Sequence, residues 1–476
     1  MIFASPLFLF LFLPGVLLTY WLLPGTRARN VLLLLASLVF YAWGEAGFVV
    51  VLLVSVMVNF ILARRLEGQP TAAGRKGILA LGVAGNLALL GVCKYANPAI
   101  NFALHLSGAK AAAAFDFFTL PLGISFFTFH ALSYLIDVYR QKRRAAAHPG
   151  DLALYMFFFP QLIAGPILRW QAMAPQIVSR EHSLEKFADG VRRLVAGLAK
   201  KILIANTVAL PADQIFSLPA SQLSTADAWL GMVCYTLQIY FDFSGYSDMA
   251  MGMGKMFGFE FMENFRFPYR AESIRDFWRR WHISLSTWFR YYVYFPLGGN
   301  RAGRARTGIN LLVVFFLCGL WHGASWTFVI WGMYHGLFLV LERTAFGSVV
   351  AQMPRTLRHL YALLVVMTGW VLFRAEDFPG ACNYLCALGG FGHAFAAQPF
   401  WRYATPLVLW AILAGTLCST PWWEPLQARL ANAAAGRPAF QAGLLVARTV
   451  GVLITFFLSR AWMAGATYTP FIYYRF

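Results

Sequence analysis

Long apolar runs without a single charged residue recur along this chain. The first extends from Leu7 to Leu23, and later ones cover 30–44, 46–63, 77–93, 117–136 and 152–168. Each is close to the ~20 residues that cross the hydrocarbon core of a bilayer as a helix. Because a chain in lipid must satisfy its own backbone hydrogen bonds, such runs fold as helices. We therefore predict an all-α, polytopic membrane protein.

The composition supports a membrane protein rather than a soluble one. Charged residues make up 12% of the chain, whereas soluble domains have roughly 25%. No polar segment is long enough to fold separately, so we expect a single membrane-embedded domain over residues 1–476. Its expected parts are N-terminal helices (1–168), amphipathic and signature segments (186–306), a broken helix (307–342) and C-terminal helices (359–476).

The distribution of basic residues predicts the orientation of the chain. The loops 24–29, 64–76 and 140–148 carry ten lysines and arginines, whereas the alternating side carries two, Lys94 and Lys110, in a long 94–116 connection. Basic loops remain in the cytoplasm, so the N-terminus is expected outside. No basic residue precedes the first run, which predicts a retained helix rather than a cleaved signal peptide. The net charge of +19 is explained either by this topology or by a phosphate-bearing partner, and no nucleic-acid partner is expected.

The pattern is less regular after residue 168. Residues 186–201 mix basic and apolar positions, which predicts an amphipathic interfacial helix. Residues 228–247 predict a span that contains Asp242 and ends in a polar island. The run 307–341 has no charge over 35 residues, too long for one crossing at about 1.5 Å per residue, and its centre, 319–325, is the expected break. With further spans near 359–373, 378–395, 403–420 and 445–463, we predict roughly ten to twelve crossings.

His322 lies in the middle of this uncharged run, between Trp321 and Gly323. A polar group at membrane depth is costly and needs a role. Glycines at positions 319 and 323 permit a helix break, so the imidazole is expected to face a cavity. A core histidine that is hydrogen-bonded to a neighbouring helix is an equally good interpretation of this segment alone.

A second segment, 264–306, combines nine arginines with two acidic residues and places His282 among three tryptophans. A purely topological basic loop does not need aromatic residues at this density. The segment suits a helix half-sunk in the membrane interface beside a site for an anion, with Arg279 and Arg280 as candidate contacts. An interfacial anchor helix is the alternative.

These histidines suit general base catalysis. An imidazole of pKa ~6.5 takes a proton from a hydroxyl near neutral pH, and acyl transfer from a thioester to that hydroxyl needs little more than a held donor and excluded water. Cys318 and His322 have the spacing of a zinc half-site or a nucleophile pair, but no second ligand pair follows, and no metal is expected. Asp242 either orients a histidine, binds an acceptor hydroxyl, caps a helix break or pairs with an arginine, and we favour the structural roles.

Six segments of the chain carry a resemblance to a known family. They are 120–140 (LPLGISFFTFHALSYLIDVYR), 159–169 (FPQLIAGPILR), 241–254, 277–300, 319–332 and 470–476. Over nearly its whole length the chain resembles the membrane-bound O-acyltransferase superfamily. The similarity is to the bacterial branch that O-acetylates polysaccharides such as alginate.

The resemblance implies a fold and a set of site residues. The implied fold is a ring of about eleven transmembrane helices around a central tunnel, with short re-entrant helices. His322 matches the family's catalytic histidine, and His282 matches its second signature position. Tyr291 departs from the family pattern, because in relatives an aspartate usually follows the arginine that matches Arg290. If that aspartate shapes the entrance for the acyl donor, the preference for donor or partner differs in this chain. The assignment of the two histidines is unaffected. We expect a further group to line the substrate tunnel: Asp242, Trp321, Arg279 and Arg280.

The expected function is O-acetylation of an exported polysaccharide by a bacterial inner-membrane enzyme with a periplasmic N-terminus. Acetyl-CoA would be a co-substrate rather than a tightly bound cofactor, with His322 as the base and His282 orienting or polarising the acyl carbonyl. The acetyl group would pass to the polysaccharide directly or through periplasmic acetyltransferase or secretion proteins. Membrane lipids would surround the enzyme. Alternative acceptors are peptidoglycan, cellulose or a teichoic acid that receives D-alanine. Outside the family, a flippase for acylated glycans and a secretion scaffold are the alternatives, although the internal repeats typical of transporters are not evident.

Overall fold

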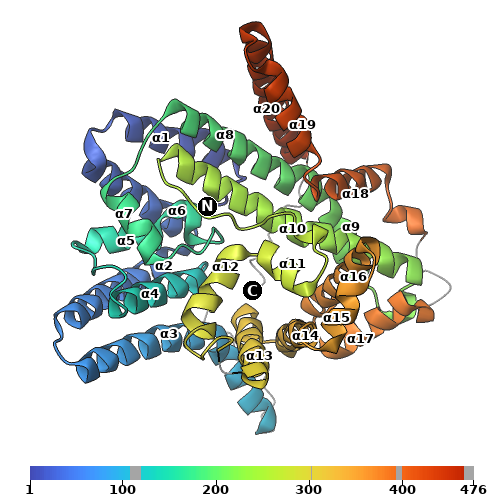
Figure 1. Cartoon of the computed structure of the whole chain (residues 1–476), viewed down its shortest axis with the longest axis horizontal. Helices are drawn as coiled ribbons and strands as arrows, with labels where there is room; N and C mark the ends of the chain where they lie inside the picture. Colours follow the sequence, from blue (N-terminus) through green and yellow to red (C-terminus); the bar gives the residue numbers. More distant parts are fainter. Residues whose placement is uncertain (108–119, 302, 393–398, 466–476) are drawn as a thin grey trace. The chain divides into compact units, whose positions relative to one another are not determined.

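The computed structural model describes residues 1–107, 120–301, 303–392 and 399–465. All regular secondary structure among these residues is helical, as predicted (Figure 1). The predictions for Lys110, for the start of the run 117–136, for the end of the run 378–395 and for the segment 470–476 lie outside the described residues.

The chain divides into two compact units, one of residues 1–191 and 250–262, the other of residues 192–249 and 263–476. The helices of the first unit are α1 (Leu13–Leu22), α2 (Gly25–Gly68), α3 (Ala72–Leu106), α4 (Ile124–Tyr139), α5 (Pro149–Phe157), α6 (Phe159–Leu162) and α7 (Trp170–Val178). Both units share α8 (Leu184–Ala199) and α10 (Thr225–Met256). The helices of the second unit are α9 (Asn206–Phe216), α11 (Ile274–Arg280), α12 (Ile283–Phe289), α13 (Gly303–His322), α14 (Trp326–Leu341), α15 (Ala345–Gln352), α16 (Arg355–Arg374), α17 (Phe378–Cys386), α18 (Pro406–Cys418), α19 (Trp423–Ala434) and α20 (Pro438–Gly465).

In the first unit, α2 packs against α1, α3, α4 and α5. It bends at Glu45, whose φ of −140° and ψ of 46° are not helical, so the predicted runs 30–44 and 46–63 form the two arms of one kinked helix. The buried amides of Asn59 and Asn86 join α2 to α3, and each donates to the other's oxygen at 3.2 and 2.8 Å. Reciprocal bonds of this kind satisfy polar groups that would otherwise be costly in lipid.

In the second unit, α13 and α14 form a helical hairpin that presents its tip at residues 322–326. Glycines let the two backbones meet, because a Cβ on Gly319 would clash with the carbonyl oxygen of Phe328, and one on Gly332 would clash with that of Phe315. Small residues permit this close approach between membrane helices. α14 also packs on α16, and this contact completes the wall around the hairpin tip.

By length and composition, six described helical segments are long and apolar enough to cross a membrane. They are Gly25–Gly68, Ala72–Leu106, Leu184–Phe216, Gly303–His322, Arg355–Arg374 and Pro438–Gly465. Shorter apolar helices accompany them at Phe8–Leu22, Ile124–Tyr139, Trp326–Leu341 and Pro406–Cys418. The prediction of an all-α polytopic protein is confirmed, whereas the number of crossings stays a prediction.

Two predicted boundaries in the first unit are wrong. α3 continues through Lys94 to Leu106, so the predicted 94–116 connection begins too early; one lysine does not end a helix, because its helix propensity is high. The predicted span 152–168 is instead two short helices, α5 and α6. Phe158 separates them with a non-helical ψ of 109°, and its successor Phe159 donates its N–H to the hydroxyl of Ser37.

One prediction about the polar segments is confirmed in part, and another is wrong. Residues 186–201 form an amphipathic helix as predicted, and this helix continues into the segment Leu184–Phe216, which is long and apolar enough to cross a membrane. The interfacial position of the helix stays a prediction. Its buried Lys201 is paired with an acid of α10, and such pairing makes a charge tolerable at membrane depth. The polar island at 241–248 does not end a helix, because α10 continues to Met256.

The α13–α14 contact predicts the effect of a glycine substitution. Gly332→Val should lower the melting temperature of the purified protein by at least about 5 °C, because the added side chain forces the helices apart. Gly85→Ala is the matched control, since a Cβ there meets open space. The melting temperatures of both variants are measured by heating the protein and quantifying, by size-exclusion chromatography, the fraction that stays folded. An unchanged midpoint for Gly332→Val would contradict the packing described.

Candidate active site

His322 is the last residue of α13, at the tip of the hairpin. The helix ends there, and Ser325 caps α14 by accepting a hydrogen bond from the N–H of Thr327 at 3.3 Å. The predicted break in the 35-residue run is confirmed by these helix bounds. The side chain of His322 is 6% exposed, so a titratable ring lies almost entirely inside the protein.

Aromatic rings surround the imidazole of His322. Trp331 and Phe373 meet it edge to face, each with ring centroids 5.0 Å away, and Trp321 lies at 4.6 Å. Contacts of this geometry are favourable and restrict the orientation of the ring. They also exclude water, which strengthens electrostatic interactions and prevents hydrolysis of a reactive acyl group.

His282 is held in an unusual backbone conformation between α11 and α12. Its φ is +43°, in the left-handed region, and it is the N-cap of α12. The carbonyl of Asn264 accepts a hydrogen bond from the N–H of Ile283 at 2.9 Å, and the side-chain oxygen of Asn264 lies 3.1 Å from Nδ1 of His282. Asn264 therefore fixes both the backbone and the ring at this position.

The hydrogen bonds of Asn264 determine which nitrogen of His282 carries a proton. The same Oδ1 accepts from the N–H and the hydroxyl of Ser284, at 3.2 and 2.9 Å, so this atom is an acceptor. Nδ1 of His282 must then donate, and Nε2 carries the lone pair. Nε2 has no hydrogen-bond partner among the described residues. Burial lowers the pKa of His282 to about 3, so the ring is neutral and ready to accept a hydrogen bond.

Trp321 lies between the two histidines. Its ring centroid is 6.5 Å from that of His282 and 4.6 Å from that of His322. Three of the residues predicted from the sequence are thus brought together, although 39 positions separate His282 from Trp321 along the chain.

A cavity of about 280 Å³ lies beside this centre, between α11, α12 and α13. Four arginines line it, namely Arg275, Arg279, Arg290 and Arg343. None of the four forms an ion pair with any described residue. Its apolar part includes Trp278 and Cys318, and Cys318 is one helical turn, about 6 Å, before His322. The cavity therefore combines four arginines that form no ion pair among the described residues with an apolar wall, and it shares helix α13 with His322.

Two other candidates have partners of their own. Arg280 pairs with Asp276 at 2.9 Å and does not line the cavity that Arg279 lines. Asp242 is buried and pairs with Lys201 at 2.5 Å. Asp242 therefore has the structural role that we favoured, but its ion-pair partner is a lysine and not an arginine. The reason is that Lys201, in the segment after α8, lies against Asp242 of α10.

The sequence interpretation missed Asn264 and His335. Nothing in the sequence distinguishes Asn264 from other loop asparagines. His335 had a visible signal, since it lies in the same uncharged run as His322. It is fully buried, its ring centroid lies 5.2 Å from that of Trp278, and neither of its nitrogens has a partner among the described residues.

The sequence profile of the membrane-bound O-acyltransferase family matches residues 105–378, more than half of the chain. This range contains both histidines, Asn264 and the arginine-lined cavity. The chain belongs to the membrane-bound O-acyltransferase family. It is therefore an O-acyltransferase, and the resemblance drawn from the six sequence segments is confirmed.

Individual members of the family are similar over most of the chain. A probable alginate O-acetylase AlgI of Azotobacter vinelandii is 41% identical over the full length of both proteins. A probable alginate O-acetylase AlgI of Pseudomonas aeruginosa is 45% identical over 82% of this chain and 75% of the relative. A peptidoglycan O-acetyltransferase of Helicobacter pylori is 38% identical over 82% of this chain and 80% of the relative.

For this O-acyltransferase, the tether between Asn264 and His282 makes a testable prediction. Asn264→Ala should lower the rate of acyl transfer at least about tenfold, because it removes the acceptor that fixes the His282 tautomer. Asn264→Asp should recover part of the rate, since a carboxylate accepts the same bonds. The alanine variant must be as abundant in the membrane as the parent, and an unchanged rate would show that the tether has no role in the reaction.

Proposed function

We propose that this O-acyltransferase transfers acetyl groups from acetyl-CoA to hydroxyl groups of an exported polysaccharide of the alginate type. The observation that carries the proposal is the arginine-lined cavity one helical turn from His322. The full-length similarity to a probable alginate O-acetylase supports the choice of acceptor.

The cavity suits a donor that carries phosphates at one end and an acyl thioester at the other. Guanidinium groups bind phosphate oxygens through paired, charge-assisted hydrogen bonds. Since Arg275, Arg279, Arg290 and Arg343 have no acidic partner among the described residues, a phosphate does not have to displace one. The apolar part of the cavity takes the uncharged arm of the donor and directs the thioester toward His322.

His322 acts as the general base in this scheme. It takes the proton of the acceptor hydroxyl while the oxygen attacks the thioester carbonyl. The C–S bond of the resulting tetrahedral species then breaks, and the imidazolium returns the proton to the departing thiolate. The surrounding aromatic rings keep out water, which would otherwise compete as the acceptor.

His282 orients rather than polarises in this scheme. Its Nε2 has a lone pair and no proton, so it cannot donate a hydrogen bond to the acyl carbonyl. Because the reacting hydroxyl gives its only proton to His322, Nε2 accepts a hydrogen bond from a neighbouring hydroxyl of the acceptor sugar and thereby orients that sugar. This replaces the carbonyl-polarising role considered from the sequence. A neutral imidazole at this point also avoids a second positive charge beside the imidazolium that forms on His322.

The cellular setting follows from the same proposal. We place the enzyme in the bacterial inner membrane with its N-terminus in the periplasm, and the ten basic residues of the segments 24–29, 64–76 and 140–148 support this orientation. Acetyl-CoA then enters from the cytoplasm, and the polysaccharide receives the acetyl group on the other side, directly or through periplasmic proteins.

Peptidoglycan is the second candidate acceptor, because the Helicobacter pylori relative is a peptidoglycan O-acetyltransferase. Mass spectrometry of both polymers from a strain that lacks the gene distinguishes the two. We expect acetyl groups to be lost from the exopolysaccharide alone. Loss of acetyl groups from peptidoglycan alone would show that peptidoglycan, and not the exopolysaccharide, is the acceptor.

His322→Ala should reduce acetylation of the polysaccharide to background, because no other base remains at the hairpin tip. The measurement is acetyl content of the polymer by mass spectrometry, with protein abundance in the membrane checked in parallel. His105→Ala, at an exposed position of α3, is the matched control and should keep full acetylation. Normal acetylation by His322→Ala would overturn the assignment of the base.

The arginine cavity predicts a change in donor affinity. Arg275→Gln and Arg290→Gln should each raise the KM for acetyl-CoA about tenfold with little change in kcat, because each removes one phosphate contact. Arg304→Gln is the control, since Arg304 is exposed and does not line the cavity. Equal kinetic constants for all three variants would place the donor phosphates elsewhere.

A further inference from the structure

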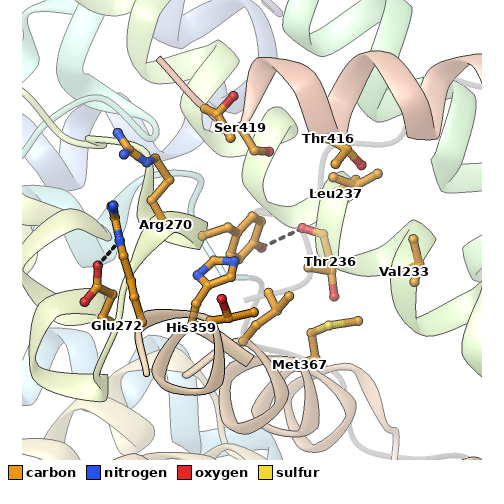
Figure 2. A pocket seen from close by; sticks show the side chains of 14 residues that line it. Val233, Thr236, Leu237, Arg270, Glu272, His359, Met367, Thr416 and Ser419 are labelled. Carbon is orange, nitrogen blue, oxygen red and sulfur yellow. Dashed lines mark hydrogen bonds and ion pairs between the residues drawn. The ribbon is translucent and has the colours of Figure 1, made fainter. Parts of the chain in front are cut away.

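A second and larger cavity, of about 520 Å³, lies between α10, α16 and α18 in the same unit. Figure 2 shows its two ends, with Arg270 and Glu272 at one and Val233, Leu237 and Met367 toward the other. None of its lining residues lines the arginine cavity beside His322. It is therefore a separate site, which the acyl-transfer scheme does not use.

The polar end of this cavity has an excess of positive charge. Glu272 pairs with Arg355 at 2.7 Å and with Arg358 at 2.8 Å, so its single charge is already shared by two arginines. Arg270 is exposed and forms no ion pair with any described residue. Nδ1 of His359 donates a hydrogen bond to the carbonyl of Ala271 at 3.3 Å, which fixes the His359 ring at the cavity wall. This end suits a single anionic group.

A hydroxyl group in the wall has no partner. Thr236 is 5% exposed, lines the cavity, and its Oγ1 makes no hydrogen bond to any described residue. A buried hydroxyl without a partner is unfavourable, so a ligand with an acceptor atom would be favoured there. The backbone carbonyl of Thr236 is not available to a ligand, because it accepts a hydrogen bond from the hydroxyl of Tyr269 at 2.6 Å (Figure 2).

The rest of the wall is largely apolar and follows a helix that is long and apolar enough to cross a membrane. Thr416, Ser419 and Thr420 also line it, but their hydroxyls donate to backbone carbonyls three or four residues earlier. Arg355 and His359 lie in the first turns of α16, whereas Leu363 and Met367 line the cavity one and two turns further along that span. The charged end therefore lies near the end of the span, where headgroups are found, and the apolar part extends to the depth of acyl chains. Val233 and Leu237 of α10 continue the apolar surface.

We infer that this cavity binds one phospholipid with an anionic headgroup. The headgroup phosphate binds to Arg270, an ester carbonyl accepts the hydrogen bond of the Thr236 hydroxyl, and an acyl chain lies along Leu237 and Met367. The order of groups in the lipid, from anion to ester to hydrocarbon, is the order of groups along the wall. This inference does not depend on the proposed acyl transfer.

Native mass spectrometry of the full-length protein in detergent tests the inference with phosphatidylglycerol and phosphatidylcholine as probes. The parent should retain one phosphatidylglycerol in preference to phosphatidylcholine. Arg270→Gln should weaken that retention about tenfold and Thr236→Val about threefold, because they remove a charged and a neutral hydrogen bond respectively. Arg266→Gln, an exposed arginine outside the cavity, is the matched control and should bind as the parent does.

Three outcomes would overturn the inference. Equal retention of both lipids by the parent, or unchanged retention by both Arg270→Gln and Thr236→Val, would show that the cavity does not select an anionic lipid. Displacement of the lipid by an equal concentration of soluble glycerol phosphate would show a phosphate site without a role for the acyl chain. Thr236→Val keeps the side-chain shape, so it remains informative if Arg270→Gln fails to fold.

Discussion

The backbone contact between α13 and α14 positions almost everything at the candidate active site. At Gly319 and Gly332 neither helix has a side chain, so the two backbones meet directly. Dispersion between closely packed surfaces, rather than exclusion of water, holds helices together in lipid. The contact brings Trp331 of the second helix under His322 at the end of the first. A larger residue in the hairpin would move the histidine relative to every ring that orients it.

The acidic residues of the second unit explain why positive charge remains at the donor cavity. Asp248 pairs with Lys200 and Arg193, and Asp242 pairs with Lys201, so both acids are neutralised along α10. The arginines that line the cavity beside His322 lack such partners among the described residues. The carboxylate of Glu342 lies next to this cavity, but it accepts hydrogen bonds from the backbone N–H groups of Ile274 and Arg275, at 2.6 and 3.0 Å, and forms no ion pair with a cavity arginine among the described residues. The unneutralised charge is thus a property of how acids are distributed over the fold.

The sequence predicted the helical class and the break at His322. Those predictions succeeded because charge spacing and the cost of polar groups in lipid act locally along the chain. The boundary near Lys94 failed because a single lysine does not end a helix. The boundary near Phe158 failed because the break there is accompanied by a hydrogen bond from Phe159 to Ser37, which lies in a helix distant in the sequence. Asn264 could not be predicted at all, since its role depends on a loop that folds back onto His282. The same limit applies to Thr236, whose missing partner is visible only when the packing is known.

The left-handed backbone at His282 restricts what evolution or design can place there. A φ of +43° is accessible to glycine, asparagine, aspartate and histidine, and strained for most other residues. Among these, histidine supplies a base, asparagine supplies an amide that can both donate and accept, and glycine supplies nothing. The repertoire of chemistry at this position is thus set by the Ramachandran plot before any substrate is considered. Variation among enzymes built on this loop should run chiefly between imidazole and amide.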